Sequence, residues 1–100
     1  HQGGTQYSNQ SLILMPNTIL WQPQALRQLR KLQAGDNLLV RTAVQRELAD
    51  LSASRQVKAL VGHEYGYRLR VGRWRVLFDF DGEVHIVSIE EVRKRDERTY

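Results

Sequence analysis

The stretch YRLRVGRWRVLFDF, residues 67–80, decides the fold of this chain. On both sides of Gly72-Arg73, apolar residues recur at every second position, which is the pattern of a β-strand with one buried face. A glycine and one polar residue between two such runs are typical of a tight turn. We therefore expect two antiparallel strands, Tyr67–Val71 and Trp74–Phe80, with apolar residues on the core side and arginines on the opposite side.

The flanking residues predict further strands of the same sheet. Before the pair, Val57–Leu60 has the composition of a short strand and Gly62–Gly66 that of a loop. After the pair, Asp81-Gly82 is a strong two-residue hairpin signal. The next strand is therefore expected over Val84–Ile89, followed by a short polar tail over Glu90–Tyr100.

The N-terminal half predicts one strand, Thr18–Trp21, followed by two helices. Pro23 suits the first position of a helix, because its missing N–H is not needed there, and leucines recur every three residues after it. We expect Gly35 to end this helix and Asp36 to cap the next one, which runs to about Ser52. The apolar face of that second helix is formed by Val40, Val44, Leu48 and Leu51.

These elements predict an α+β fold, an antiparallel β-sheet with an N-terminal α-helical hairpin packed on one face. We expect one domain over residues 15–100, starting at Met15, with residues 1–14 as a remnant or extension in front of it. The alternative is that Leu12-Ile13-Leu14 belongs to the first strand.

Composition excludes several kinds of protein. The 100 residues include no cysteine, which rules out a disulfide scaffold, a cysteine-ligated zinc site and a thiol nucleophile. The apolar stretches are far shorter than the ~20 residues of a membrane helix, so we expect a cytoplasmic protein with no membrane partner. Asp and His residues with metal-ligand spacing are not seen either, and we expect neither a metal nor another cofactor.

The formal net charge of +4 hides a segregation of charge along the chain. Residues 55–75 hold six Lys or Arg and one Glu, whereas residues 79–91 hold five Asp or Glu and no Lys or Arg. Residues 93–98 are basic again, with four Lys or Arg against two acids. The local charge therefore favours an anionic partner more than the net charge does.

The strand arginines are candidates for binding that anion. Arg68 and Arg70 are two residues apart on one strand, so they point the same way, roughly 7 Å apart, and Arg75 can join them from the neighbouring strand. Guanidinium groups match phosphate oxygens well, which predicts a phosphate-binding face. The alternative is a solvated sheet face whose arginines pair with the acidic residues Asp79, Glu83 or Glu90.

Two blocks of the sequence resemble the RelE/ParE toxin superfamily of bacterial toxin–antitoxin systems. One comprises residues 67–78, the strand Val84–Ile89 and an Arg-Lys-Arg tail that ends in Tyr100. The other, Trp21-x-Pro23-x-Ala25-Leu26-x-x-Leu29-x-x-Leu32, is similar to the family's first helix. The resemblance covers nearly all of residues 15–100 and implies a RelE-like fold.

The resemblance implies one of two activities. RelE-type members cut mRNA in the ribosomal A site, and ParE-type members inhibit DNA gyrase and are not nucleases. We expect the first, with the ribosome and mRNA as partners and metal-independent attack by the RNA 2′-OH on the scissile phosphate. Both activities imply a cognate antitoxin and, through the antitoxin complex, operator DNA. A third alternative is a toxin-fold domain that has no activity outside such a DNA-binding complex.

The resemblance to the RelE type also implies a site. Catalysis is assigned to Arg68, Arg70, Arg75, Arg95 and Tyr100, with Lys94 as an alternative to Arg95. Additional phosphate binding is assigned to Lys58, Arg73, Lys94 and Arg98.

This chain departs from the best-known RelE-type pattern, which has lysines where this chain has Arg68 and Arg70. Arginine stays protonated in proteins, so it can neutralise a phosphate but is a poor general base. The resemblance matches Tyr100 to the family's tyrosine near the C-terminus, which implies that it either accepts the 2′-OH proton or stacks on a base.

Overall fold

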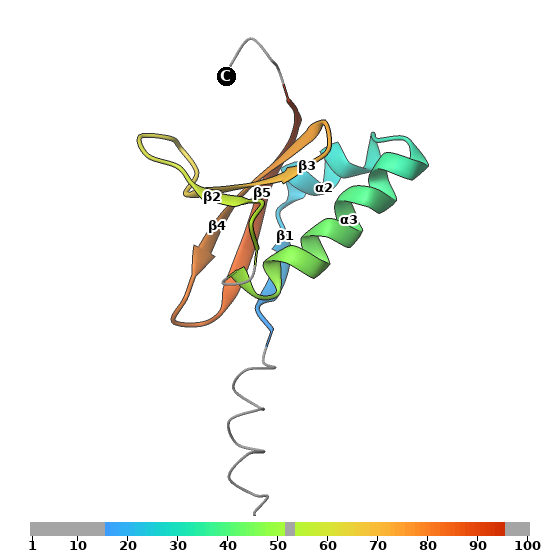
Figure 1. The fold of residues 1–100 in the computed structure, drawn as a ribbon. Helices are drawn as coiled ribbons and strands as arrows, with labels where there is room; N and C mark the ends of the chain where they lie inside the picture. The colour runs from blue at the N-terminus through green and yellow to red at the C-terminus, as the bar shows by residue number, and fades with distance from the viewer. Residues whose placement is uncertain (1–15, 52–53, 96–100) are drawn as a thin grey trace, which may run out of the picture.

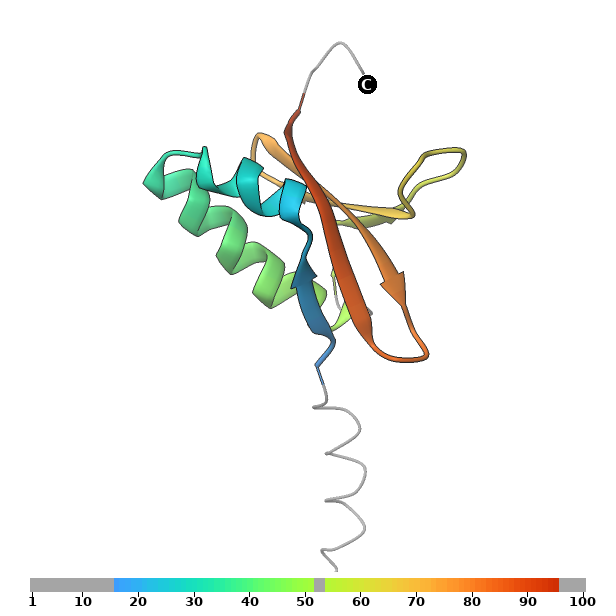
Figure 2. The same ribbon diagram turned by 180° about the vertical axis from the view of Figure 1, so that it is seen from behind.

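The computed structural model describes residues 16–51 and 54–95 of the chain. Five strands form one sheet in the order β1-β5-β4-β3-β2, and two helices cover one of its faces (Figures 1 and 2). This architecture confirms the predicted α+β fold. The elements are β1 (Thr18–Trp21), α2 (Pro23–Arg30), α3 (Ala34–Leu48), β2 (Val57–Ala59), β3 (Tyr67–Val71), β4 (Trp74–Asp81) and β5 (Ile86–Lys94).

The alternating stretch forms the strand pair that the sequence predicts. Strands β3 and β4 are antiparallel, with Leu69 opposite Val76 and Arg70 opposite Arg75. Leu69 and Val76 are fully buried, whereas Arg70 is exposed. Because successive side chains of a strand point to opposite faces, the core and the arginines lie on opposite sides of the sheet.

The helices pack their apolar residues onto this core face. Helix α2 buries Ala25 and Leu29, and its contacts with the sheet are made mainly to β5. Helix α3 buries Val40, Val44 and Leu48, as the spacing predicts, and also Ala43. Leu51, predicted on the same face, lies beyond the end of the helix and is half-buried. Among the described residues, neither helix has the length and apolar content needed to cross a membrane.

One edge of the sheet differs from the antiparallel arrangement that the sequence predicts. Strand β1 runs parallel to β5, with Thr18 opposite Ile86 and Trp21 opposite Ile89. Parallel neighbours need a long crossover connection, which the two helices and strands β2–β4 provide between β1 and β5.

The predicted boundary between the two helices is wrong. Helix α2 ends at Arg30 and α3 begins at Ala34, so Gly35 and Asp36 both lie in the first turn of α3. The side-chain amide of Asn37 helps to cap the C-terminus of α2, because it donates a 2.9 Å hydrogen bond to the carbonyl of Leu29. The end of α3 at Leu48 also precedes the expected Ser52, which lies outside the described residues.

The turn between β4 and β5 is longer than predicted. Asp81 pairs with Ile86, which leaves residues 82–85 as the loop, so the predicted strand start at Val84 is wrong. The side chain of Asp81 accepts a 2.9 Å hydrogen bond from the backbone N–H of Glu83, and His85 adopts a positive φ of 56°. An aspartate that binds the backbone two residues on stabilises this wider turn.

Strand β5 also continues to Lys94, where the sequence predicts a polar tail from Glu90. A register shift causes the difference, because Leu77 pairs with Glu91 and the next residue, Phe78, pairs with Ile89. Glu90 is thus the extra residue of a β-bulge. The bulge brings both Ile89 and Val92 to the core face, although their spacing of three breaks the alternation.

Two glycines are expected to respond in opposite directions to replacement by alanine. Gly35 has open space around its Cβ position and a helical location, so Gly35→Ala should raise the free energy of unfolding by about 0.4–1 kcal/mol. Gly72 has a φ of +55° in the β3–β4 turn, so Gly72→Ala should lower it by roughly 1–2 kcal/mol. Urea denaturation of both variants measures the difference. Destabilisation by Gly35→Ala would contradict the helical placement of Gly35.

Candidate functional site

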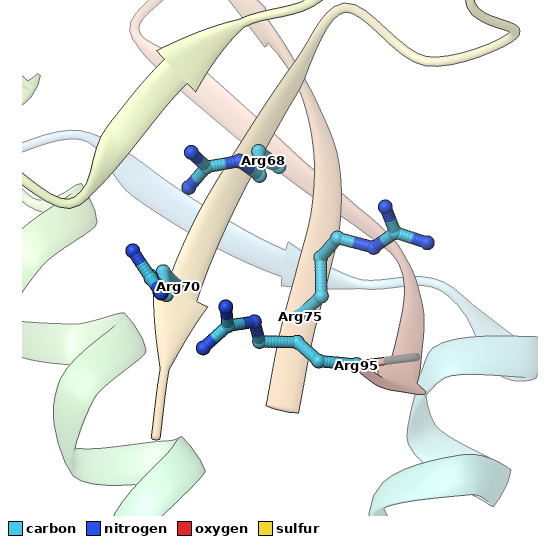
Figure 3. Close-up of a pocket in the computed structure, with 4 residues that line it drawn as sticks. All are labelled: Arg68, Arg70, Arg75 and Arg95. Atoms are coloured by element: carbon cyan, nitrogen blue, oxygen red, sulfur yellow. The ribbon is translucent and has the colours of Figure 1, made fainter. Parts of the chain in front are cut away.

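Four arginines, three from the β3–β4 hairpin and one from the end of β5, line one cavity of about 200 Å³. Arg68 and Arg70 come from β3, Arg75 from β4, and Arg95 from the residue after β5 (Figure 3). These four include every described residue to which the sequence analysis assigns a catalytic role. The structure thus brings these four candidate residues together at one cavity.

The β3–β4 turn fixes the position of Arg95 beside the strand arginines. The backbone N–H of Arg95 donates a 2.7 Å hydrogen bond to the carbonyl of Arg73, and its Nη1 donates one of 3.2 Å to the carbonyl of Gly72. Nη1 of Arg68 donates a 3.3 Å hydrogen bond to the carbonyl of Gln56, the residue before β2. Two of the four guanidinium groups are therefore held by backbone carbonyls.

The four guanidinium groups are not equivalent. Figure 3 shows that those of Arg68, Arg70 and Arg95 extend to one side of β4, with Arg95 reaching across toward Arg70. The guanidinium of Arg75 points away from the other three, although its side chain lines the same cavity. Arg75 would have to rotate its side chain to meet a ligand held by the other three.

The remaining predicted basic residues divide between the two faces of the sheet. Lys58 on β2 is exposed and lies opposite Arg68, so it extends the arginine face. Arg73 and Lys94 instead line a separate cavity of about 270 Å³, together with Lys31 and Trp74. Lys94 and Arg95 therefore project into different cavities, which favours Arg95 over Lys94 at the arginine site.

Two predicted residues, Arg98 and Tyr100, lie outside the described residues. Of the described histidines, His63 and His85 are both exposed, and neither lines the arginine cavity. In the described ranges, no three His, Asp or Glu side chains gather as a metal site would require.

Sequence reasoning missed a buried ionic network on the arginine face. Glu91 has only 6% of its surface exposed and accepts hydrogen bonds from Nη2 of Arg93 at 2.6 Å and from Nε of Arg93 at 2.8 Å. The hydroxyl of Tyr65 donates a third, at 2.7 Å. We name Tyr65, Glu91 and Arg93 the Glu91 network. The predicted polar tail concealed it, because β5 was expected to end before Glu91.

The network shifts the pKa values of its members. The hydrogen bonds from Arg93 lower the pKa of Glu91 below its usual 4.5, against the opposing effect of burial. The hydrogen bond to Glu91, followed by burial, raises the pKa of Tyr65 to about 12. Near neutral pH, Glu91 is therefore ionised and Tyr65 keeps its proton, so Tyr65 is not available as a general base.

Ionised Glu91 should make stability depend on pH in the acid range. Since its pKa is lower in the folded chain than in the unfolded chain, Glu91 stabilises the fold above pH 4.5, and this contribution is lost as the pH falls through the lowered pKa. The free energy of unfolding should thus fall more steeply with decreasing pH in the wild type than in Glu91→Gln once the pH drops below 4.5. Urea denaturation at several pH values measures the slopes. Parallel slopes would show that Glu91 is not stabilised as an anion.

Comparisons with known proteins place the chain in a family. The family described as "ParE toxin of type II toxin-antitoxin system, parDE" matches residues 19–99. A search of curated proteins gives no match.

Several solved structures share the fold. A toxin–antitoxin complex of Mycobacterium tuberculosis, RelBE2, contains a chain that is 26% identical, with a TM-score of 0.70, over 82% of this chain and 94% of that one. A RelE–RelB complex of Pyrococcus horikoshii gives 17% identity and a TM-score of 0.69, over 83% and 99% of the two chains. The isolated RelE toxin of Escherichia coli gives 19% and 0.62, over 83% and 90%. The family match extends over most of the chain, and this chain belongs to the RelE/ParE family of type II toxin–antitoxin toxins.

Proposed function

We propose that this toxin is a ribosome-dependent mRNA endoribonuclease that uses the arginine cavity to bind the scissile phosphate. The observation that carries the proposal is the gathering of Arg68, Arg70, Arg75 and Arg95 around one cavity of about 200 Å³. A group of guanidinium ions on a sheet face repels itself unless an anion lies among them, and their geometry suits phosphate oxygens. The likeness to RelE structures supports the same choice at the level of the fold.

The proposed reaction uses the 2′-OH of the RNA as the nucleophile. Its oxygen gives up its proton to a base and attacks the adjacent phosphorus, the bond to the 5′-oxygen of the next nucleotide breaks, and that oxygen takes up a proton from water. The products carry a 2′,3′-cyclic phosphate and a 5′-OH. Negative charge grows on the non-bridging oxygens in the transition state, so arginines fixed in place stabilise that state more than the ground state.

The four arginines divide this work according to their positions. Arg68 and Arg70 would hold the non-bridging oxygens, and Arg95 would lie near the leaving 5′-oxygen. Arg75 would rotate toward the phosphate as it binds. Tyr100 is proposed to accept the 2′-OH proton, and Lys58 and Arg98 to bind flanking phosphates.

The proposed partners follow from this function. We infer a cognate antitoxin, because the similar M. tuberculosis and P. horikoshii structures are toxin–antitoxin complexes. The ribosome and mRNA are the proposed targets, which implies action in the cytoplasm, and the antitoxin complex is proposed to bind operator DNA.

The second candidate function is inhibition of DNA gyrase, which is favoured by the match to the ParE toxin family. Two assays on the wild-type toxin, freed from its antitoxin, separate the candidates. We expect ribosome-bound mRNA to be cut in the A-site codon and gyrase to supercoil DNA as fast as without toxin. Intact mRNA together with blocked supercoiling would refute the nuclease proposal and support gyrase inhibition.

A further inference from the structure

Three arginines lie directly across from one another on neighbouring strands of the arginine face. Arg70 on β3 is opposite Arg75 on β4, and Arg75 is opposite Arg93 on β5. Like charges in such positions destabilise a sheet and compete for the same anion. Arg70 and Arg75 belong to the proposed RNA site but Arg93 does not, so the row contains one more cation than that site uses.

Arg93 differs from the other two because a carboxylate of its own strand holds it. Both bonds from Arg93 to Glu91 are short, at 2.6 and 2.8 Å, and the side chain of Glu91 is only 7% exposed. Glu64 adds a weaker ion pair at 3.4 Å. A two-bond arginine–carboxylate pair fixes both the charge and the plane of the guanidinium.

Tyr65 fixes the same carboxylate from a different part of the chain. Its hydroxyl donates to Glu91, and it lies in the loop between β2 and β3, next to Gly66, whose N–H donates a 2.7 Å hydrogen bond to Asp79. Glu91 is therefore held from both sides, and Leu77, opposite it on β4, is fully buried. Glu91 has little freedom to leave Arg93.

We propose that Glu91 is a positioning residue of the RNA site, which keeps the guanidinium of Arg93 out of the arginine row so that the RNA phosphate binds at the cavity and not toward β5. The inference rests on the proposed function. Glu91 itself touches no RNA. Its effect is to compensate the charge of Arg93 and to hold that guanidinium at β5.

The variant Glu91→Gln tests this role, because it keeps the size of the side chain and removes its charge. Arg93, which then keeps only the weaker 3.4 Å ion pair with Glu64 and whose side chain is already 37% exposed, should attract a phosphate. RNA binding should become tighter, with the log–log slope of affinity against salt concentration steeper by about 0.7, as expected for one more neutralised phosphate on a single strand. At the same time kcat for cleavage should fall tenfold or more, since the phosphate is displaced from its reactive position.

Binding is measured with an oligoribonucleotide that carries a 2′-deoxy nucleotide at the scissile position, and cleavage is measured on programmed ribosomes. A simultaneous fall in Kd and kcat is the predicted signature. A purely structural role predicts weaker or unchanged binding in Glu91→Gln, and that result would overturn the proposal.

The double variant Glu91→Gln/Arg93→Gln removes both members of the ion pair. It separates the effect of the released Arg93 charge from a general effect of losing Glu91. It removes the released cation together with the carboxylate, so binding and kcat should both return close to wild-type values. A double variant that cleaves no faster than Glu91→Gln would contradict the proposal. If the wild type binds the oligonucleotide but leaves mRNA intact, the nuclease proposal fails, while the binding measurements still decide whether Glu91 restrains Arg93.

Discussion

Replacing Arg70 with alanine is expected to lower kcat for cleavage of ribosome-bound mRNA by about 10²–10³-fold, the usual effect of removing one donor that stabilises transition-state charge. Arg70 is exposed, and its guanidinium and that of Arg95 lie on the same side of β4 at the arginine cavity (Figure 3). No core contact is lost in this variant, so its melting temperature should stay near that of the wild type. Single-turnover cleavage on programmed ribosomes measures the rate.

Matched variants give this prediction its controls. Arg70→Lys keeps the charge but loses the planar two-donor geometry, so its rate should lie between wild type and Arg70→Ala. Arg27→Ala removes an exposed arginine from α2, on the other side of the sheet, and should cleave as fast as wild type. If Arg70→Ala and Arg27→Ala cleave equally fast, the arginine cavity is not the catalytic site.

Replacing Phe78 with alanine should lower the free energy of unfolding by roughly 3–5 kcal/mol, the usual cost of removing a buried phenyl ring. Phe78 is fully buried at the centre of β4, and its ring stacks on that of Tyr67 with centroids 5.4 Å apart. A small domain has only about 5–15 kcal/mol of stability in total, so this loss is a large fraction of it and should lower the melting temperature strongly.

Thermal melting followed by circular dichroism measures the loss. Leu20→Ala is the control, because Leu20 is also a large apolar residue but is 45% exposed, and it should cost much less. Equal melting temperatures for the two variants would contradict the position of Phe78 at the centre of the core.

The parts of the fold that the sequence predicts best are those in which one simple pattern covers a whole element. Strict alternation gives β3 with its observed ends, Tyr67 and Val71, and Pro23 marks the start of α2. The arginine face follows from the same alternation, since Arg68 and Arg70 must lie opposite the buried Leu69.

The parts that were missed depend on contacts between distant residues. The end of α2 is closed by the side chain of Asn37 and not by Gly35, which no local pattern indicates. The bulge at Glu90 breaks the alternation of apolar residues in β5. The sequence therefore predicts a strand that ends at Ile89 and places Glu91 in a polar tail. The parallel pairing of β1 with β5 likewise depends on the path of the whole chain.

The same limit applies to the candidate site. Alternation and the family resemblance brought Arg68, Arg70, Arg75 and Arg95 together, as the structure does. They gave no sign that the guanidinium of Arg75 points away from the other three, or that Arg93 is held by Glu91. Side-chain directions and buried ion pairs depend on the register of three strands, which a single sequence does not reveal.

The proposed cleavage at the arginine cavity requires attack by the RNA 2′-OH. Removing that hydroxyl from the substrate is the most direct test. Two mRNAs that differ only by a 2′-deoxy nucleotide at the scissile position of the A-site codon are placed on ribosomes and incubated with the wild-type toxin. We predict that the unsubstituted mRNA is cut to products with a 5′-OH end and that the substituted mRNA stays intact. Equal cutting of both, or of neither, would contradict the account.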